Sequence, residues 1–108
     1  MDYKAKEESF DFIISTEALE HDRYFNHSLM KMFSLLKSGG FVLITCAIYP
    51  RPEHGTLNNA PLDSPATNSY YENIVPINLM DIIHCLCCKY AMEVNREHGD
   101  LYLWGIKK

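Results

Sequence analysis

The sequence predicts an α/β fold in which parallel strands alternate with helices and an antiparallel hairpin closes the sheet. Two short apolar segments, residues 10–15 and 41–47, flank a stretch whose apolar residues recur every three or four positions, as they do along an amphipathic helix. A second helical stretch and two short strands follow a proline-rich segment. With 108 residues, the chain forms at most one domain.

The N-terminal part of the chain contains a lead-in and a first strand. Residues 1–9 are polar and precede a domain that spans residues 10–108. Within residues 10–15, apolar residues occur among the even-numbered and among the odd-numbered positions, which point to opposite faces of a strand. We therefore expect a strand that is covered on both faces. Thr16 follows the strand as a candidate helix N-cap and predicts a short helical turn.

Two helices and a second strand follow. The first helix is expected at about residues 24–37 and is expected to end at Gly39 and Gly40, because glycine adopts the left-handed cap conformation at little cost. Residues 41–47 are rich in β-branched and aromatic residues and predict an interior parallel strand. The second helix is expected at about residues 77–90.

The remaining segments predict a long loop and a hairpin. Residues 48–73 contain four prolines and several Asn and Ser residues, which exclude a long regular element. A loop of this length within a domain is usually functional, and it would leave the sheet at the same end as residues 16–21. Residues 91–96 and 101–107 predict two short strands around a turn.

Composition excludes several classes of protein. The net charge is −4 and the ten Lys and Arg residues are scattered, which argues against a nucleic-acid-binding surface. No segment approaches the roughly 18 apolar residues that cross a bilayer. The N-terminus also lacks the apolar core of a signal peptide. We therefore expect a cytoplasmic protein that does not bind membranes.

The four cysteines do not predict a disulfide framework. Cys46 lies in a predicted core strand, and Cys85, Cys87 and Cys88 lie near the end of the second predicted helix. His84 beside them suggests a zinc site, but a second pair of ligands at a distance is missing. We interpret the cysteines as small buried residues, three of them on a packed helix.

The order of these motifs resembles a known family. FDFIISTEALEH (residues 10–21), followed by LLKSGGFVLIT (residues 35–45), is similar to the second half of a class I S-adenosylmethionine-dependent methyltransferase. Residues 10–47 carry the match, and residues 48–108 match only in the order of the elements. The resemblance implies a Rossmann-like sheet whose last strand inserts antiparallel between its two predecessors. It also implies methyl transfer from S-adenosylmethionine to an acceptor, which we expect to be a small molecule.

One motif of that family does not occur in this chain. The five glycines, at positions 39, 40, 55, 99 and 105, do not form the Gly-x-Gly-x-Gly turn that binds the cofactor. We therefore expect a truncated or partial methyltransferase domain. The alternative is a non-catalytic remnant that acts as an interaction module. In either case the strand at residues 10–15 would lack a neighbour, so we expect it to bind a partner chain or to self-associate.

The resemblance also implies positions for the donor site. Ser15, Thr16 and Glu17 occupy the strand end that lines the donor pocket in the family, and ligands of open α/β sheets bind beyond the carboxyl ends of strands. The alternative is structural. Ser15 and Thr16 would then only cap a helix, and Glu17 would only complement the helix dipole.

Glu17, Glu20 and His21 suggest a metal site. Their i, i+3 and i+4 spacing places them on one face of a helical turn, and carboxylates with an imidazole suit magnesium or manganese. The pattern resembles the metal sites of ubiquinone-pathway O-methyltransferases and small-RNA 2′-O-methyltransferases. The RNA enzymes add a histidine after the next strand, where His54 lies. Leu-Glu-His also occurs in metal-free members, in which case His21 could act as a general base.

The loop after the second strand is the expected substrate contact. Arg51, Glu53 and His54 combine a cation, a carboxylate and an imidazole, and Tyr70 and Tyr71 offer stacking surfaces. Such a set would suit an anionic or aromatic acceptor. The alternative is a polar surface loop with two half-buried tyrosines.

Overall fold

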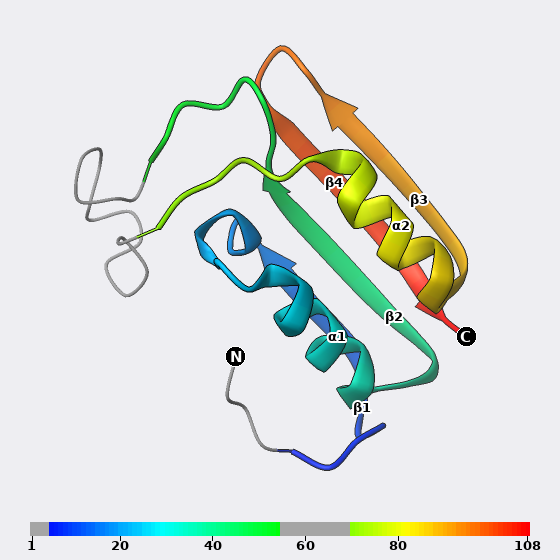
Figure 1. Ribbon diagram of the computed structural model, residues 1–108. Coiled ribbons are helices and arrows are strands. Elements are labelled where there is room, and N and C mark those ends of the chain that lie inside the picture. Colours follow the sequence, from blue (N-terminus) through cyan, green and yellow to red (C-terminus); the bar gives the residue numbers. More distant parts are fainter. Residues whose placement is uncertain (1–4, 55–69) are drawn as a thin grey trace.

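A computed structural model describes residues 5–54 and 70–108 (Figure 1). Its elements are β1 (Phe10–Thr16), a 3-10 turn η1 (Leu19–His21), α1 (Phe25–Leu35), β2 (Leu36–Ala47), α2 (Pro76–Leu86), β3 (Cys87–Asn95) and β4 (Asp100–Lys107). The middle of the predicted loop, residues 55–69, lies outside the described residues, as do residues 1–4 of the lead-in.

The sheet has the strand order β1-β2-β4-β3. β1 and β2 are parallel, and β4 is antiparallel to both of its neighbours. The predicted α/β class, with parallel strands and a closing antiparallel hairpin, is confirmed. The insertion of the last strand between its two predecessors is confirmed as well.

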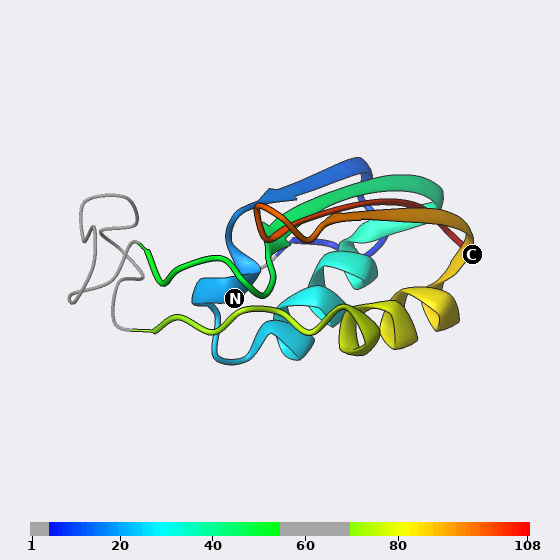
Figure 2. The ribbon, with the colours of Figure 1, turned by 90° about the horizontal axis from the view of Figure 1, so that it is seen from above.

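Both helices cover the same face of the sheet (Figure 2). The core between the two layers includes Leu29, Phe33, Val42, Ile44, Leu79, Ile83, Leu101 and Leu103, all nearly or fully buried. On the opposite face, Phe12 and Ile14 of β1 are 50% and 55% exposed. Within the described residues, the prediction that this strand is covered on both faces is therefore wrong, because no described helix lies over its second face.

The first helix ends earlier than predicted, and the two glycines do not cap it. α1 ends at Leu35, and Leu36 is fully buried with extended backbone angles of φ −84° and ψ 135°. Burial of this apolar side chain leads the chain directly into β2. Gly39, at φ +80°, instead lies where β2 carries extra residues relative to β1 and the register shifts. Its conformational freedom serves this irregularity of the strand rather than a helix end.

The second helix also ends early, at Leu86, because Cys87 and Cys88 belong to β3. Side chains alternate between the two faces of a strand, so Cys87 is buried and Cys88 is exposed. Cys85 is exposed and Cys46 is buried. The interpretation of the cysteine group as buried helical residues is therefore wrong for Cys85 and Cys88, and Cys87 is buried in a strand.

The predicted hairpin turn between β3 and β4 packs closely against the segment that follows β2. Gly99 has φ +76°, and a Cβ there would lie 2.5 Å from the backbone nitrogen of Arg51 and 2.6 Å from the carbonyl oxygen of Ile48. The Ile48 amide donates a hydrogen bond of 2.9 Å to the Gly99 carbonyl. Only glycine satisfies both the backbone angle and this approach. Among the described helices, none is long and apolar enough to span a membrane.

Candidate functional site

Three segments converge at the carboxyl ends of β1 and β2. Parallel strands end at the same edge of a sheet, so residues 17–21 and 48–54 leave it together. The Glu17 amide donates to the Thr45 carbonyl at 2.8 Å. Residues 70–75 join them, because the Glu72 amide donates to the Glu20 carbonyl at 2.8 Å. This edge, which we call the rim, is the meeting point that the sequence predicts.

Arg51 links three elements across the rim. Its Nη2 donates to Glu17 Oε1 at 3.3 Å and also contacts Asp100 Oδ1 at the start of β4. Its Nε donates to the backbone carbonyl of His98 at 3.2 Å. The cation predicted to contact substrate is therefore held between two carboxylates, and Asp100 is a partner that sequence reasoning missed.

Glu17 has an unusual backbone conformation. Its φ is +50°, in the left-handed region that residues with a side chain rarely adopt. Such residues cluster at functional sites, where the surrounding structure holds them in place. Thr16 is the last residue of β1, and η1 has Ala18 as its N-cap without a side-chain cap. The prediction that Thr16 caps a helix is therefore wrong, because the strand continues through it.

Glu20, His21 and His54 form a compact group beside Arg51. One potential ligand atom from each lies within 4.8 Å of the others, and the distance from His54 Nε2 to Glu20 Oε1 is 3.9 Å. Glu20 is fully buried, and neither carboxylate oxygen has a hydrogen-bond partner among the described residues. Burial, reinforced by the charge of Glu17, raises the pKa of Glu20 to about 7. A buried carboxylate without hydrogen bonds is unfavourable, so Glu20 is suited to take up a proton or a cation.

His21 is oriented by the backbone of the third segment. Its ring is nearly buried, and Nδ1 donates to the Tyr70 carbonyl at 3.1 Å. This bond places the proton on Nδ1 and the lone pair on Nε2. The ring packs edge-to-face against His54 and Tyr71, at centroid distances of 5.3 and 5.4 Å. Burial and the charge of Glu20 raise the pKa of Tyr71 to about 12, so its hydroxyl stays protonated.

The other predicted site residues are dispersed around this group. Glu17 pairs with Arg51 and precedes the helical turn, which covers only residues 19–21. The three residues therefore do not share a helical face as the spacing argument assumed, and the role of Glu17 as a metal ligand stays a prediction. Ser15 is half-buried in β1, and Glu53 is exposed beyond the end of β2.

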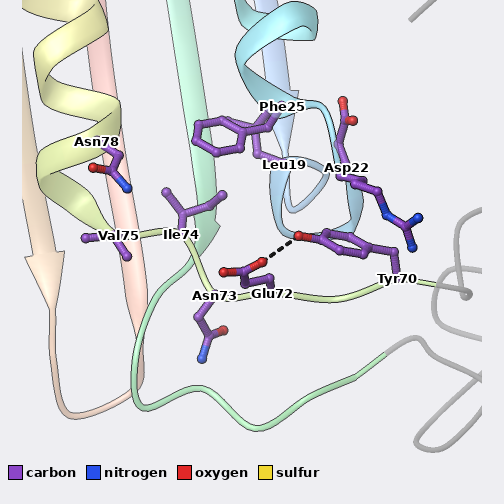
Figure 3. A pocket seen from close by; sticks show the side chains of 10 residues that line it. Leu19, Asp22, Phe25, Tyr70, Glu72, Asn73, Ile74, Val75 and Asn78 are labelled. Atoms are coloured by element: carbon purple, nitrogen blue, oxygen red, sulfur yellow. Dashed lines mark hydrogen bonds between the residues drawn. The ribbon is translucent and has the colours of Figure 1, made fainter.

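A small pocket opens on the helix side of the rim, between the starts of α1 and α2 (Figure 3). Its volume is about 140 Å³, and its apolar lining includes Leu19, Phe25 and Ile74. The Tyr70 hydroxyl donates to Glu72 at 2.6 Å at one side of the pocket. Pockets for drug-sized ligands occupy about 300 to 1,000 Å³, so this one accommodates only a small group.

Asp22 also lines the pocket and was not predicted from the sequence. Its carboxylate accepts hydrogen bonds from the Tyr24 amide and from the Ser28 hydroxyl. Asn73, another unpredicted residue, donates to the Arg51 carbonyl at 2.9 Å. No local pattern marks either residue. Asp100 could have been found, because the predicted insertion of the last strand brings the start of β4 to the rim.

Comparison with known proteins supports the fold. No protein-family model matches the chain, and no curated protein matches it. A solved S-adenosylmethionine-dependent methyltransferase of Thermotoga maritima, described as a possible histamine N-methyltransferase, has a TM-score of 0.70 at 15% identity. The match covers 99% of this chain and 60% of that one.

A second solved structure is similar. It is the complex of the Haloferax volcanii Trm112 methyltransferase activator with a candidate methyltransferase, with a TM-score of 0.63 at 14% identity. The match covers 98% of this chain and 57% of the other, so the chain spans about three fifths of the length of both similar proteins. At these identities the likeness establishes the fold: the chain has a methyltransferase-like α/β fold, as the motif order implied.

Proposed function

We propose that this chain is part of an S-adenosylmethionine-dependent methyltransferase that acts on a small molecule, with its reaction site at the rim. The observation that carries the proposal is the Glu20, His21 and His54 group at the carboxyl ends of two parallel strands. Ligands of open α/β sheets bind at this position. The methyltransferase-like fold supplies the reaction class.

His21 is the proposed general base. A sulfonium donor already carries an activated leaving group, so the protein mainly has to align the reactants and remove a proton from the acceptor. The lone pair on His21 Nε2 would accept that proton. The bond from Nδ1 to the Tyr70 carbonyl would keep the ring oriented, and the adjacent Glu20 carboxylate would stabilise the imidazolium.

The donor would lie against the end of β1. Ser15, Thr16 and Glu17 occupy that strand end, and Glu17 is held in position by Arg51 and by the Thr45 carbonyl. The glycine-rich donor loop would come from another polypeptide segment, either upstream in the same protein or on a partner chain. The similar Haloferax protein is bound to an activator chain, which supports a partner chain as one source of this loop.

A divalent cation also fits the site. Glu20, His21 and His54 would hold it, because the Glu20 oxygens have no hydrogen-bond partner among the described residues and two imidazoles stand nearby. Imidazole ligands favour manganese over magnesium. A bound ion would polarise an acceptor hydroxyl and lower its pKa. Arg51 and Glu53, with Tyr70 and Tyr71, would contact an anionic or aromatic acceptor.

The second candidate function is a non-catalytic interaction module. Phe12 and Ile14 on the open face of β1 favour it, because both are about half exposed. Exposed apolar groups on an edge strand mark a site of association.

An NMR titration distinguishes the two functions. With S-adenosylmethionine at millimolar concentration, we expect weak binding and amide shifts confined to residues 15–21 and 48–54. Micromolar affinity would contradict the need for an external donor loop. Amide shifts that lie on the open face of the sheet instead of at the rim would contradict the methyltransferase proposal and favour the interaction module.

Calorimetry with manganese tests the cation site. We expect binding by the wild-type chain and by the control variant Glu97→Gln, which changes an exposed turn residue. The double variant Glu20→Gln/His21→Ala is expected to lose binding. If the double variant binds manganese as the wild-type chain does, the proposed ligands are wrong.

A further inference from the structure

Among the described residues, no helix covers the sheet face opposite α1 and α2 (Figure 2). This open face carries exposed apolar side chains. Phe12, Ile14 and Tyr102 on this face are 50%, 55% and 46% exposed. Phe41 stacks against Phe12 and against Trp104, with ring centroids 5.4 and 6.1 Å apart. A continuous apolar surface of this kind usually marks an interaction site.

The strand register divides this open face into three rows that cross β1, β2, β4 and β3 in that order. The lower row lies toward the amino end of β1 and the upper row lies at the rim. From lower to upper, the rows are Phe12, Phe41, Ile106 and Lys89; Ile14, Leu43, Trp104 and Ala91; and Thr16, Thr45, Tyr102 and Glu93. The only charged residues in these rows are Lys89 and Glu93, and both lie on β3.

We propose that the open face packs against the open face of a second copy of this chain, around a two-fold axis that runs across the strands through the middle row. Such an interface is self-complementary, because each contact occurs twice. Two sheets that pack face to face lie about 10 Å apart with their strands within about 30° of each other.

Charge complementarity favours this axis. The two-fold axis places the lower row of one copy over the upper row of the other copy. It also places the middle rows of the two copies over each other. Lys89 then lies opposite Glu93 of the second copy, and the pair forms twice. Leu43 and Trp104 meet their own counterparts at the centre. The two charges that would be costly to cover are therefore neutralised by the same symmetry that buries the apolar rows.

The area is sufficient for a dimer. Four strands about 4.8 Å apart, each contributing about seven residues of about 3.3 Å, make a flat area of about 450 Å² per copy. Two copies therefore cover about 900 Å², and projecting side chains raise the accessible area that is buried. The flat area alone lies slightly below the roughly 1,000 Å² that a specific interface requires, and the projecting side chains supply the remainder.

The inference does not depend on the proposed function. Face-to-face packing leaves the outer backbone edge of β1 open. Of the residues assigned to the reaction site, only Thr16 lies in one of the three rows, and Glu20 and His21 lie outside them. Face-to-face packing also differs from the association expected through residues 10–15, because the contact is made by side chains of all four strands and not by the edge of one.

Sedimentation velocity and tryptophan fluorescence test the dimer. We expect a monomer–dimer equilibrium over about 1 to 200 µM, because association depends on concentration. Trp104 is the only tryptophan of the chain, so its emission should shift to the blue as the dimer forms. Ile14→Asp, at an exposed position of the middle row, should yield a folded monomer.

Charge reversal tests the geometry. Glu93→Lys and Lys89→Glu should each weaken the dimer about tenfold, because each creates two like-charge contacts. The double variant Glu93→Lys/Lys89→Glu should restore it. Asp81→Lys, which changes an exposed residue of α2 by the same charge, is the matched control and should leave the dimer unchanged.

Two results would overturn the proposal. A monomer over the whole concentration range would show that this face is open or covered by something other than a second copy. If Ile14→Asp still forms the dimer, the dimer is assembled through a different surface, such as the edge of β1. The same conclusion follows if the double charge variant does not restore the association that the single charge variants weaken.

Discussion

Replacing Glu20 by glutamine should stabilise the metal-free chain at alkaline pH and change its stability little at acid pH. Glutamine keeps the shape of the protonated carboxyl group but cannot become charged. Burial, and then the charge of Glu17, raise the pKa of Glu20 from 4.5 to about 7. The folded state therefore binds this proton more tightly than the unfolded state does.

The sign and size of the effect follow from linkage. Because the folded pKa is raised, the stability contributed by the protonated group is fully present below pH 4.5 and is lost as the pH rises through about 7. One pKa unit corresponds to about 1.4 kcal/mol. Above pH 8, where Glu20 is charged, the shift of its pKa from 4.5 to about 7 therefore lowers the free energy of unfolding by about 3 kcal/mol. Between pH 5 and pH 8 we expect the free energy of unfolding of the wild-type chain to fall by about 2 to 3 kcal/mol relative to that of Glu20→Gln.

Urea denaturation in the presence of a chelator measures this difference. The wild-type chain and Glu20→Gln are compared at pH 5 and pH 8, with Glu97→Gln as the exposed control. The difference between the two Glu20 forms should grow with pH, whereas the control should follow the wild-type chain. If Glu20→Gln and the wild-type chain respond equally to pH, Glu20 is not a buried carboxyl group without hydrogen bonds and the description of the site is wrong.

Three further predictions concern the same structure. Gly99→Ala should destabilise the chain by about 2 to 4 kcal/mol, because a Cβ there meets backbone atoms. Gly39→Ala, also at positive φ but with open space around it, should cost about 1 kcal/mol. Equal effects of the two substitutions in urea denaturation would contradict the packing of the hairpin turn. The exposed thiols of Cys85 and Cys88 should react quickly with a thiol reagent. Cys46 and Cys87, whose pKa values burial raises to about 12 and about 11, should react only on unfolding. Four thiols that all react quickly would refute this. At pH 8, manganese at about 100 times its dissociation constant should stabilise the wild-type chain by about 2.7 kcal/mol but leave Glu20→Gln unchanged in a thermal shift assay.

Much of the topology follows from local sequence patterns. Apolar periodicity predicts both helices and the strands, and the order of the elements predicts the parallel pair. The resemblance to the methyltransferase family implies the inserted last strand. The element ends are less predictable. Gly39 and Gly40 have the local chemistry of a helix cap, yet the burial of Leu36 ends α1 before them. Cys87 and Cys88 continue a helical pattern, but pairing with β4 takes them into a strand.

The candidate site divides in the same way. From their spacing, the sequence suggested Glu17, Glu20 and His21 as one metal site, and the family resemblance added His54. In the structure, Glu20, His21 and His54 lie together. The sequence could not show that Glu20 is fully buried without a hydrogen-bond partner among the described residues, nor that Arg51 lies between Glu17 and Asp100.

The sequence by itself therefore determined the order of the elements, their direction in the sheet and the edge at which the polar residues gather. These properties depend on periodicity, turn residues and motif order, which are local or are read along the chain. Only the tertiary structure decided the burial of Glu20, the pairing of Arg51 and the face of the sheet that the helices leave open. Burial and electrostatic environment are set by residues far apart in sequence, so they become defined only when the layers pack.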